Sequence, residues 1–468
     1  MPSGARRWVI AMQELAVLEG STKRKVRPIV DGEMVPPVPA VLVRALESIW
    51  EQSVREAQKI GPGGLGPLEK KLREDILRLG GLMLGEALPL ALGTGYSHSR
   101  LPCPCGGKAK YINDRPKTIT TLLSDTRLLR AYYHCCDCGE GQVPMDEVLG
   151  VEGSTFSPGA REAICLLDAQ RSFETGRDLL ERLSGVRMHE EQGRLLAHEK
   201  GRELERQTQE ELRNVWQPKK PSPREIAETA QRLYFSPDGT TVLTQEENWK
   251  EAKMGTVFST DIPRRGQDPQ RLHTRYAATM GNAEDLGKRL YVEALKLGLA
   301  EQTRVVVVAD GAHWIWTWAE NSLPKHRVEI IDFYHASEKL WEVSRSVFGE
   351  ENPEGKGWAR RWRDKLYKGK VGACFAALRR LKPRTQEGRE AVRKTIGYFQ
   401  NNRKRMRYNE FRKAGYFIGS GVTESGCKHL VGQRLKQAGM RWKVEGAQAM
   451  LQLRAAYLNG RWDSLWRN

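Results

Sequence analysis

The sequence has no apolar run long enough to cross a membrane. The longest apolar stretch of its first third, Leu82 to Leu92, contains Glu86 and Pro89, whereas a membrane-spanning helix needs about 20 mostly apolar residues. The pair Arg6 and Arg7 precedes an apolar run of only about five residues, which is too short for a secretory signal. Both absences predict a cytoplasmic protein without transmembrane helices, in which thiols stay reduced.

The last quarter of the sequence has little negative charge. Residues 351–468 contain 28 Lys and Arg against 9 Asp and Glu, whereas residues 1–350 contain 48 against 49. The net charge of +18 therefore comes entirely from this last quarter. Such segregation favours a polyanionic partner, nucleic acid in particular, over a neutral small molecule. A solvated basic surface is the alternative.

The chain is long enough for several buried cores. Its 468 residues, 39% of them hydrophobic, predict about three domains. In the N-terminal region, residues 40–57 and 68–84 carry apolar side chains at three- and four-residue spacing, which predicts helices. These helices would serve either self-association or docking against the rest of the chain.

Five of the eight cysteines lie in one window, residues 98–148. Cys103 and Cys105 form a CxC pair, and Cys135 and Cys138 form a CxxC pair. A glycine follows each pair and supplies the tight turn that lets two sulfurs face one ion. Two such knuckles about thirty residues apart, with β-prone segments between them, predict a zinc ribbon with four thiolate ligands.

The cysteine window has other interpretations. Cys136 or His134 could replace one of the four ligands, and buried free cysteines or disulfides are the alternatives to a zinc site. Cys165, Cys374 and Cys427 have no partner at ligand spacing, so we expect them to be packing residues.

A pair of helices is predicted after the cysteines. The first, over 172–183, ends at Gly185, and the second covers 188–204. This pattern is that of a possible helix-turn-helix DNA-binding region. A structural helical pair is the alternative, because His189 and the glutamates after it stand where a groove-reading helix favours basic or amide side chains. Residues 219–223 then predict a linker.

Two aspartates mark a predicted α/β core. Short strands at 233–235 and 242–243 flank Asp238, and the β-branched run 304–309 predicts a central strand that ends at Asp310. Neighbouring strands lie roughly 5 Å apart, so both carboxylates could hold one divalent cation such as Mg²⁺. A turn-forming role is the alternative for either aspartate alone.

A third acid follows a glycine-rich turn. Residues 419–421 read GSG, and Glu424 lies in the first turn of the helix predicted after them. A glutamate there can reach a metal at a sheet edge, although the helix dipole alone also favours an acid at this place. Basic and aromatic residues that could bind DNA phosphates beside the acids follow it: Lys428, Arg434, Lys436, Arg441 and Trp442.

Several long motifs resemble a known family. Residues 307–318, 331–341 and 405–442, with the knuckles CPCGG and YYHCCDCG, are similar to bacterial insertion-sequence transposases of the ISKra4 group. The resemblance covers most of the chain from about residue 100. It implies a DDE transposase with an RNase H-like core, in which Asp238, Asp310 and Glu424 are the three catalytic acids that bind two Mg²⁺ or Mn²⁺ ions.

The resemblance also bears on a DxxH motif formed by Asp332 and His335. Transposases of the related Mutator-like group carry a similar signature after the second acid, which implies a catalytic accessory role for His335. A structural histidine is the alternative. Asp332 competes with Glu424 as the third metal ligand.

A helical insertion is predicted between the second and third acids. Asp310 and Glu424 are 114 positions apart, more than a plain core needs, and the resembling families place an all-helical domain at this point. Arg403 and Arg405 would add cations for DNA. Trp358 and the nearby Trp362 would stack on unpaired bases or pack in the core.

These inferences predict the following regions: helical 1–97, zinc ribbon 98–150, helical 151–225, RNase H-like core 226–348, helical insertion 349–418, and the last part of the core with basic helices 419–468. The predicted function is a DDE transposase of the bacterial cytoplasm, nucleoid-associated and oligomeric on DNA. It would bind the terminal inverted repeats of its element and join them to target DNA. An RNase H-like nuclease without strand transfer and a non-catalytic, zinc-dependent DNA-binding protein are the alternatives.

Overall fold

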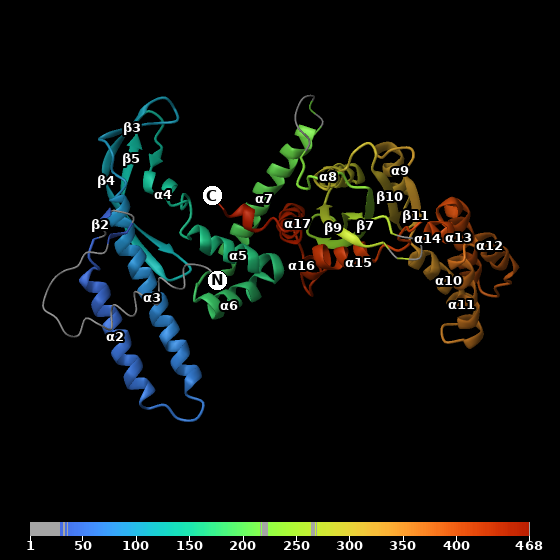
Figure 1. The fold of residues 1–468 in the computed structure, drawn as a ribbon, viewed down its shortest axis with the longest axis horizontal. Helices are drawn as coiled ribbons and strands as arrows, with labels where there is room; N and C mark the ends of the chain where they lie inside the picture. The colour runs from blue at the N-terminus through green and yellow to red at the C-terminus, as the bar shows by residue number, and fades with distance from the viewer. Residues whose placement is uncertain are drawn as a thin grey trace. The chain divides into compact units, whose positions relative to one another are not determined.

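The computed structural model describes residues 36–215, 217, 223–263, 267 and 269–467, and the backbone of 29–30 and 33–34 (Figure 1). The N-terminal arginine pair and most of the predicted linker lie outside these ranges. The chain divides into two compact units, Met1–Thr155 and Phe156–Asn468. The helical region after Phe156 thus belongs to the unit that contains the α/β core, instead of forming a domain of its own.

The first unit combines helices with a four-stranded antiparallel sheet. Its helices are α2 (Ala40–Ala57), α3 (Leu65–Leu92) and α4 (Pro144–Val148), and a small ribbon of β1 (Ile29–Val30) and β2 (Glu33–Met34) precedes them. The sheet contains, in spatial order, β3 (Arg100–Pro102), β4 (Lys108–Thr120), β5 (Asp125–Cys135) and β6 (Gly141–Gln142).

Helix α3 packs against this sheet through a glycine. A Cβ atom at Gly81 would lie 1.8 Å from the hydroxyl oxygen of Ser124, so a larger residue would push the helix away. The hydroxyl of Thr126 in β5 donates to the Gly81 carbonyl at 3.1 Å. The sequence predicted α2 at its observed bounds, whereas α3 is longer than the predicted 68–84 and continues through Pro89.

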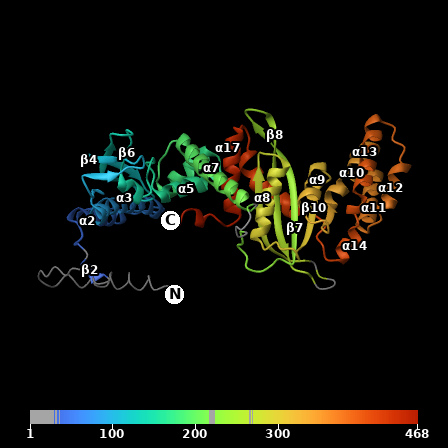
Figure 2. The same ribbon diagram turned by 90° about the horizontal axis from the view of Figure 1, so that it is seen from above.

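The second unit is built on a five-stranded mixed sheet. Its strands are β7 (Arg232–Thr244), β8 (Asn248–Thr260), β9 (Arg271–Thr279), β10 (Arg304–Ala309) and β11 (Val328–Ile331), in the spatial order β11–β10–β7–β8–β9. Strands β7, β8 and β9 are antiparallel neighbours, whereas β10 and β11 run parallel to β7. Figure 2 shows the long β7 and β8 strands along their length.

Helices surround the sheet. Before it come α5 (Pro158–Gln170), α6 (Phe173–Ser184) and α7 (Glu190–Val215); within and after it come α8 (Ala283–Lys296), α9 (His313–Ser322) and α10 (Phe333–Phe348). The predicted insertion contains α11 (Pro353–Tyr367), α12 (Val371–Arg380), α13 (Gln386–Asn402), η2 (Arg403–Arg405) and α14 (Tyr408–Lys413). The chain ends with α15 (Gly421–Cys427), η3 (Lys428–Gly432), α16 (Gln433–Leu435), α17 (Val444–Leu458) and η4 (Asp463–Leu465).

Two apolar clusters hold the second unit together. One joins β7 and the β-branched strand β10 to α8, α9, α10 and the inserted helices, and Trp358 and Trp362 are partly buried against it. Core packing is therefore the observed role of these two tryptophans. The other cluster joins one end of β7 and β8 to α5, α7 and α17, which explains why the helical pair is not a separate domain.

Strand β7 differs from the two short strands predicted around Asp238. It is one 13-residue strand, and it pairs with β8 over its whole length, from Arg232 opposite Thr260 to Thr244 opposite Asn248. Pairing with a long partner lets the strand run through Pro237, which has no N–H to donate. Asp238 is therefore part of the sheet and does not lie in a turn between two strands.

Among the described residues, no helix is both long enough and apolar enough to span a bilayer.

Candidate metal centres

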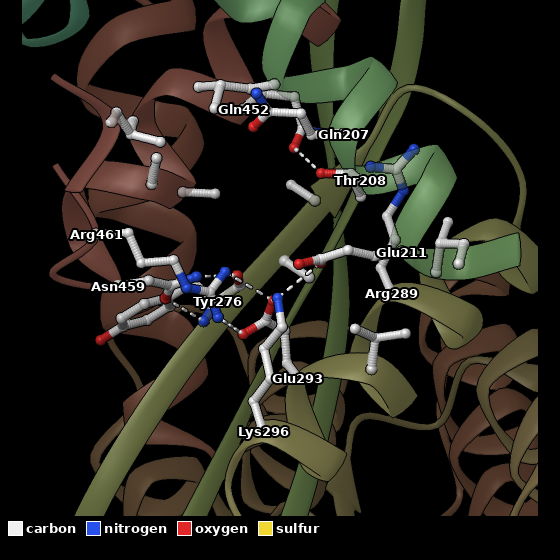
Figure 3. A pocket seen from close by; sticks show the side chains of 18 of the residues that line it. Gln207, Thr208, Glu211, Tyr276, Arg289, Glu293, Lys296, Gln452, Asn459 and Arg461 are labelled. Atoms are coloured by element: carbon white, nitrogen blue, oxygen red, sulfur yellow. Dashed lines mark hydrogen bonds and ion pairs between the residues drawn. The ribbon is translucent and has the colours of Figure 1, made fainter. Parts of the chain in front are cut away.

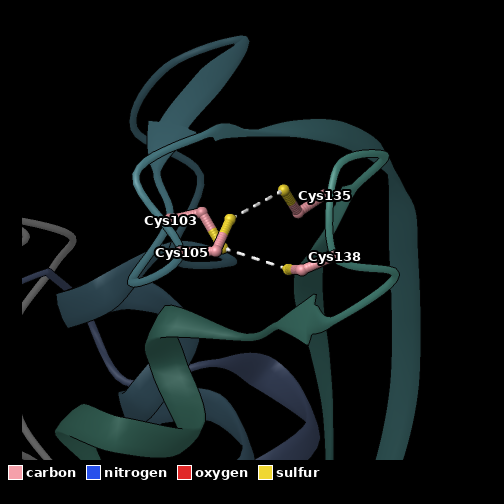
Figure 4. A group of neighbouring side chains, drawn as sticks. All are labelled: Cys103, Cys105, Cys135 and Cys138. Carbon is pink, nitrogen blue, oxygen red and sulfur yellow. Dashed lines mark hydrogen bonds between the residues drawn. The ribbon is translucent and has the colours of Figure 1, made fainter.

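The four predicted cysteine ligands lie together in the first unit (Figure 4). Their sulfur atoms are all within 4.8 Å of one another, and two cross pairs are closer, with Cys103 and Cys138 at 3.6 Å and Cys105 and Cys135 at 3.7 Å. Sulfurs bound at about 2.3 Å to a tetrahedral zinc ion are about 3.8 Å apart. The donor set and its spacing thus fit a zinc ion, and the cysteine group could hold such a metal.

Local turns bring the two cysteine pairs to face each other. Strands β4 and β5 pair with Ala109 opposite Cys135, which places the first knuckle beside the second. Gly106 and Gly139 have left-handed φ values of 91° and 77°, which other residues adopt only at a cost. These turns are what the glycines after each pair predicted.

Backbone amides tune the thiols of the second knuckle. Hydrogen bonds from the backbone of Cys138 and Asp137 lower the pKa of Cys135 to about 7, against the effect of burial. A backbone hydrogen bond at Glu140 lowers the pKa of Cys138, but burial and hydrogen bonds to the neighbouring thiols outweigh it and raise that pKa to about 12. One thiol thus ionises readily while another keeps its proton, so a metal would displace protons on binding.

The alternative ligands are not part of the group. Among the described residues, the one group of three or more Cys, His, Asp or Glu side chains whose ligand atoms lie within 4.8 Å of one another is Cys103, Cys105, Cys135 and Cys138, without Cys136 or His134. The three predicted acids Asp238, Asp310 and Glu424 do not form such a group in the described chain. Cys136 is exposed.

A pair of aspartates lies at matching positions of two parallel strands in the second unit. Val307 of β10 is opposite Phe235 of β7, and three residues further on each strand path reaches an aspartate, Asp310 and Asp238. The Ser236 hydroxyl donates to the Val308 carbonyl at 2.6 Å and links the two strands just before the acids. The parallel register of β7 and β10 therefore brings Asp238 and Asp310, the first two predicted acids, side by side.

Each of these aspartates has one oxygen occupied by a backbone amide that follows it closely in the chain. The Gly239 amide donates to Asp238 Oδ1 at 2.7 Å, and the Ala312 amide donates to Asp310 Oδ1 at 2.9 Å. Within the described chain, no hydrogen bond or ion pair involves Oδ2 of either aspartate. Those two oxygens are the atoms that could bind a hard cation.

The pKa of Asp238 is shifted by burial and by groups close to it. Burial raises its pKa, the Gly239 amide lowers it, the negative charge of Asp310 raises it, and His335 lowers it. Asp310 and His335 are therefore both within electrostatic reach of Asp238. Two carboxylates that repel each other are relieved when a cation lies between them, so the pair has the electrostatics of a metal site.

Glu424 lies on a helix docked beside Asp238. The Thr423 hydroxyl donates to the Ser236 carbonyl at 3.1 Å and lies 2.7 Å from the Thr256 hydroxyl. One turn later, the charge of Asp238 adds to burial in raising the pKa of Cys427. The charges that shift the pKa of Asp238 come from Asp310, His335 and Glu251, whereas Glu424 is exposed on α15. Its exposed carboxylate has no hydrogen bond or ion pair among the described residues.

Asp332, the competitor for the third ligand, has a different environment. It is 2% exposed and caps α10, because its Oδ1 accepts hydrogen bonds from the amides of Tyr334 and His335. Its Oδ2 accepts from both the amide and the hydroxyl of Ser420. All of its oxygens are occupied, and it ties the turn before Glu424 to α10. We therefore assign Asp332 to positioning.

Sequence reasoning missed Tyr398 of the inserted helix α13. A Cβ atom at Gly311 would lie 2.1 Å from its ring, so the tyrosine covers the turn that follows Asp310. Burial raises its pKa, and the charges of Asp310 and Asp332 add to this effect. Its buried hydroxyl has no hydrogen-bond partner in the described chain. The only sequence signal was its place in a helical insertion, which does not indicate which helix face meets the core.

The predicted DNA-binding residues divide by exposure. Lys428, Lys436 and Arg441 are exposed. The Lys436 ammonium donates to the Thr240 hydroxyl at 2.8 Å, two residues after Asp238. The Arg441 guanidinium donates to the Thr244 carbonyl at 3.1 Å, at the far end of β7. Arg403 is exposed and Arg405 is half-buried, and both belong to η2 in the inserted region.

Arg434 and Trp442 need a correction, because they lie in the core. They are 0% and 6% exposed. The Arg434 guanidinium lies over the rings of Phe173 and Trp442 at 4.4 and 4.8 Å and donates to the Asp168 carbonyl. The Trp442 indole donates to the Leu435 carbonyl. These side chains join α6 to the C-terminal segment, so they do not offer a DNA-facing surface.

A polar cavity of about 210 Å³ lies elsewhere in the second unit, between α7, α8, β9 and α17 (Figure 3). Its charged groups are paired with one another: Arg461 with Glu293 at 2.5 Å, Lys296 with Glu211 at 2.7 Å, and Arg289 with Glu205 at 2.6 Å. Such a network joins the helices and leaves little charge for a ligand. We assign it a structural role.

The comparisons with known proteins add a family. No curated protein matches the sequence. The model of an uncharacterised protein family, UPF0236, matches residues 107–467, a range that contains both aspartates, Glu424 and the second cysteine knuckle but begins after Cys103 and Cys105. The match covers more than half of the chain, and this protein therefore belongs to that family.

Proposed function

We propose that this protein is a DDE transposase that binds the ends of its own element, cuts DNA and joins the resulting 3′-hydroxyl to target DNA. The observation that carries the proposal is the matched position of Asp238 and Asp310 on parallel strands, each with a free carboxylate oxygen, beside the helix that carries Glu424. The sheet order β11–β10–β7–β8–β9 also supports an RNase H-like core.

The three acids would hold two Mg²⁺ or Mn²⁺ ions. Such ions, when bound, activate an attacking oxygen and stabilise the leaving one. The chain's own residues supply the rest. Asp332 holds the turn before Glu424, and Thr423 ties the start of α15 to β7. Lys436, anchored beside Asp238 by Thr240, places a cation where a DNA phosphate would approach the acids.

The cysteine group would support DNA end recognition. A zinc ion there would fix the two knuckles against each other, as structural zinc does in small domains that have little core of their own. The exposed basic side chains of β4 and β5, Lys110 and Arg127 among them, would then face phosphates from a rigid sheet.

The test is a cleavage and joining assay on a duplex that carries the inverted repeats flanking the coding sequence, with Mg²⁺. An Asp310→Asn variant is expected to lose cleavage by more than the roughly 10- to 100-fold that loss of an outer-shell partner costs. It should bind the duplex as the unchanged protein does. Asp364→Asn is the matched control, because Asp364 is exposed and, within the described chain, pairs only with the neighbouring Arg363.

Three results would contradict the proposal in different ways. Unchanged cleavage by the Asp310→Asn variant would reject the metal site. Cleavage without joining, when pre-cut ends are supplied, would indicate a nuclease of the same fold. Duplex binding without cleavage by the unchanged protein would indicate a non-catalytic DNA-binding protein.

A further inference from the structure

A second basic surface lies at the edge of the sheet, away from the acids. It is a groove of about 760 Å³ between β11, η2 and α14. Its basic residues, which define the edge groove, are Arg327, Arg403, Lys404, Arg405 and Arg407. Two acids, Glu329 and Glu410, also line it. The groove therefore carries a net charge of three positive units.

Ion pairs inside the edge groove fix its shape. The Glu329 carboxylate lies between two guanidinium groups, with Arg327 at 2.6 Å and Arg405 at 2.7 Å. Arg405 also lies 4.1 Å from the centre of the Trp316 ring. These contacts hold η2 along the open edge of β11. They neutralise only part of the charge, because one carboxylate serves two cations.

Two cations of the groove have no acidic partner. Arg403 and Lys404 are exposed, and the side chain of neither makes an ion pair or a hydrogen bond in the described chain. They stand next to Arg405 in the short 3-10 turn η2. The negative end of the α13 dipole attracts cations at this place, but three adjacent cations repel one another. An anion bound in the groove would remove that repulsion.

The edge groove lies beside the start of strand β11, whereas the acids lie toward the end of that strand. Val328 and Glu329 begin β11, whereas Asp332 follows its end, at the edge where Asp238 and Asp310 lie. Four residues of a strand span about 13 Å. Duplex DNA carries one charge per ~1.7 Å of its axis, so a duplex that reached both places would present about eight phosphates over this distance.

We propose that the edge groove binds the phosphate backbone of DNA as a second contact, beside the start of β11 and away from the end of that strand where the catalytic acids lie. The inference rests on the proposed function, and it assigns part of the predicted DNA surface to named residues. DNA phosphates fit better than a small anion because the groove of about 760 Å³ carries five cations and is also lined by Gln400 and Asn401, whose amides can donate to several phosphates.

The experiment measures how duplex binding depends on salt. A fluorescent 40-base-pair duplex of mixed sequence is titrated with full-length protein between 50 and 200 mM NaCl. The double variant Arg403→Gln, Lys404→Gln removes two phosphate contacts, and the slope of log affinity against log salt should fall by about 1.8, since each contact contributes about 0.9. Both side chains are exposed, so folding should not change.

Arg379→Gln with Arg380→Gln is the matched control. These two cations are also adjacent, exposed and without acidic partners in the described chain, and they end helix α12 of the same inserted region outside the groove. The control should keep the slope of the unchanged protein. Equal slopes for the two double variants would overturn the edge groove.

The result separates this inference from the proposed function. If the two double variants have equal slopes while cleavage still depends on Asp310, DNA binding by the edge groove is refuted. The transposase proposal is then unaffected. A reduced slope for the Arg403 and Lys404 variant, with cleavage that does not need Asp310, would support the groove and reject the catalytic site.

Discussion

The cysteine group and the carboxylate group differ in how much chain builds them. Cys103 and Cys138 are 35 positions apart and lie on one antiparallel hairpin. Asp238 and Glu424 are 186 positions apart, and β10, β11 and the inserted helices lie between them in the chain before α15 returns to β7. The first site therefore depends on local turns, whereas the second depends on the packing of a whole unit.

The two groups also differ in chemistry. Four thiolates are soft ligands that suit zinc, whereas free carboxylate oxygens suit hard cations such as Mg²⁺. A closed set of four ligands is typical of a structural site, and an incomplete set with open positions is typical of a catalytic one. Variants that remove one group and leave the other intact test whether the two groups have these different roles.

The largest effect is expected from loss of the cysteine group. A protein with Cys135→Ser and Cys138→Ser should contain no zinc by elemental analysis, whereas the unchanged protein should contain one equivalent. Structural zinc contributes roughly 10–16 kcal/mol in small domains, so the sheet of the first unit should lose protection from hydrogen exchange. Cys136→Ser should keep zinc, and stoichiometric zinc in the double variant would reject these ligands.

The next effect is expected from the third acid. Glu424→Gln keeps the side-chain shape but removes the charge, so cleavage should fall by more than about 100-fold. Duplex binding and thermal stability should not change, because the carboxylate is exposed. Glu445→Gln, an exposed acid early in α17, is the control. Normal cleavage by the Glu424 variant would mean that the site lacks this ligand.

A smaller effect is expected from Tyr398, which we assign to positioning. Tyr398→Phe removes a buried hydroxyl without a partner, so the free energy of unfolding should stay within about 1 kcal/mol. Cleavage should fall about tenfold, with a shifted Mg²⁺ requirement, since the hydroxyl lies near Asp310. Tyr408→Phe is the control. The buried hydroxyl of Tyr408 also lacks a hydrogen-bond partner in the described chain, but the carboxylate charge that adds to burial in raising its pKa is that of Asp332 and not that of Asp310. Equal cleavage by both variants would remove Tyr398 from the site.

The smallest effect concerns stability and pH in the second unit. Asp168 is 0% exposed, and its carboxylate has no hydrogen-bond partner in the described chain. Burial raises its pKa to about 8, although Arg434 acts in the opposite direction. A raised pKa means that the folded state binds the proton more tightly, so this contribution to stability is present below about pH 4 and is lost as pH rises towards 8.

Asp168→Asn should therefore raise the melting temperature at pH 8 by a few degrees. The gain should shrink as pH falls and vanish well below pH 4, where the aspartate is protonated in both the folded and the unfolded state. Asp178→Asn, an exposed acid in α6, should show no such trend. A gain that did not change with pH would contradict the titration of Asp168.

The cysteine group was predictable because its information is local. CxC and CxxC with glycines after them specify both the ligand type and the turns, and the hairpin needs few distant contacts. The carboxylate group was only partly predictable. The β-branched run before Asp310 indicated a central strand, but the long β7 strand through Pro237 required knowledge of its partner β8.

Burial of polar residues was the least predictable property. Arg434 and Trp442 look like DNA-binding residues in a basic stretch, yet they pack against α6. Asp332 and Glu424 both look like metal ligands, but Asp332 is buried and accepts hydrogen bonds on both oxygens, whereas Glu424 is exposed. The sequence shows that a residue is charged, but it does not show which neighbouring groups will neutralise that charge.

The sequence alone determined the ligand chemistry of the cysteine knuckles, the two aspartates and the location of the positive charge, because composition and short spacing depend only on nearby residues. Tertiary structure decided which acids share an edge, which cations stay exposed and which tyrosine covers the turn after Asp310. Those properties depend on contacts between residues more than seventy positions apart, and only packing brings such residues together.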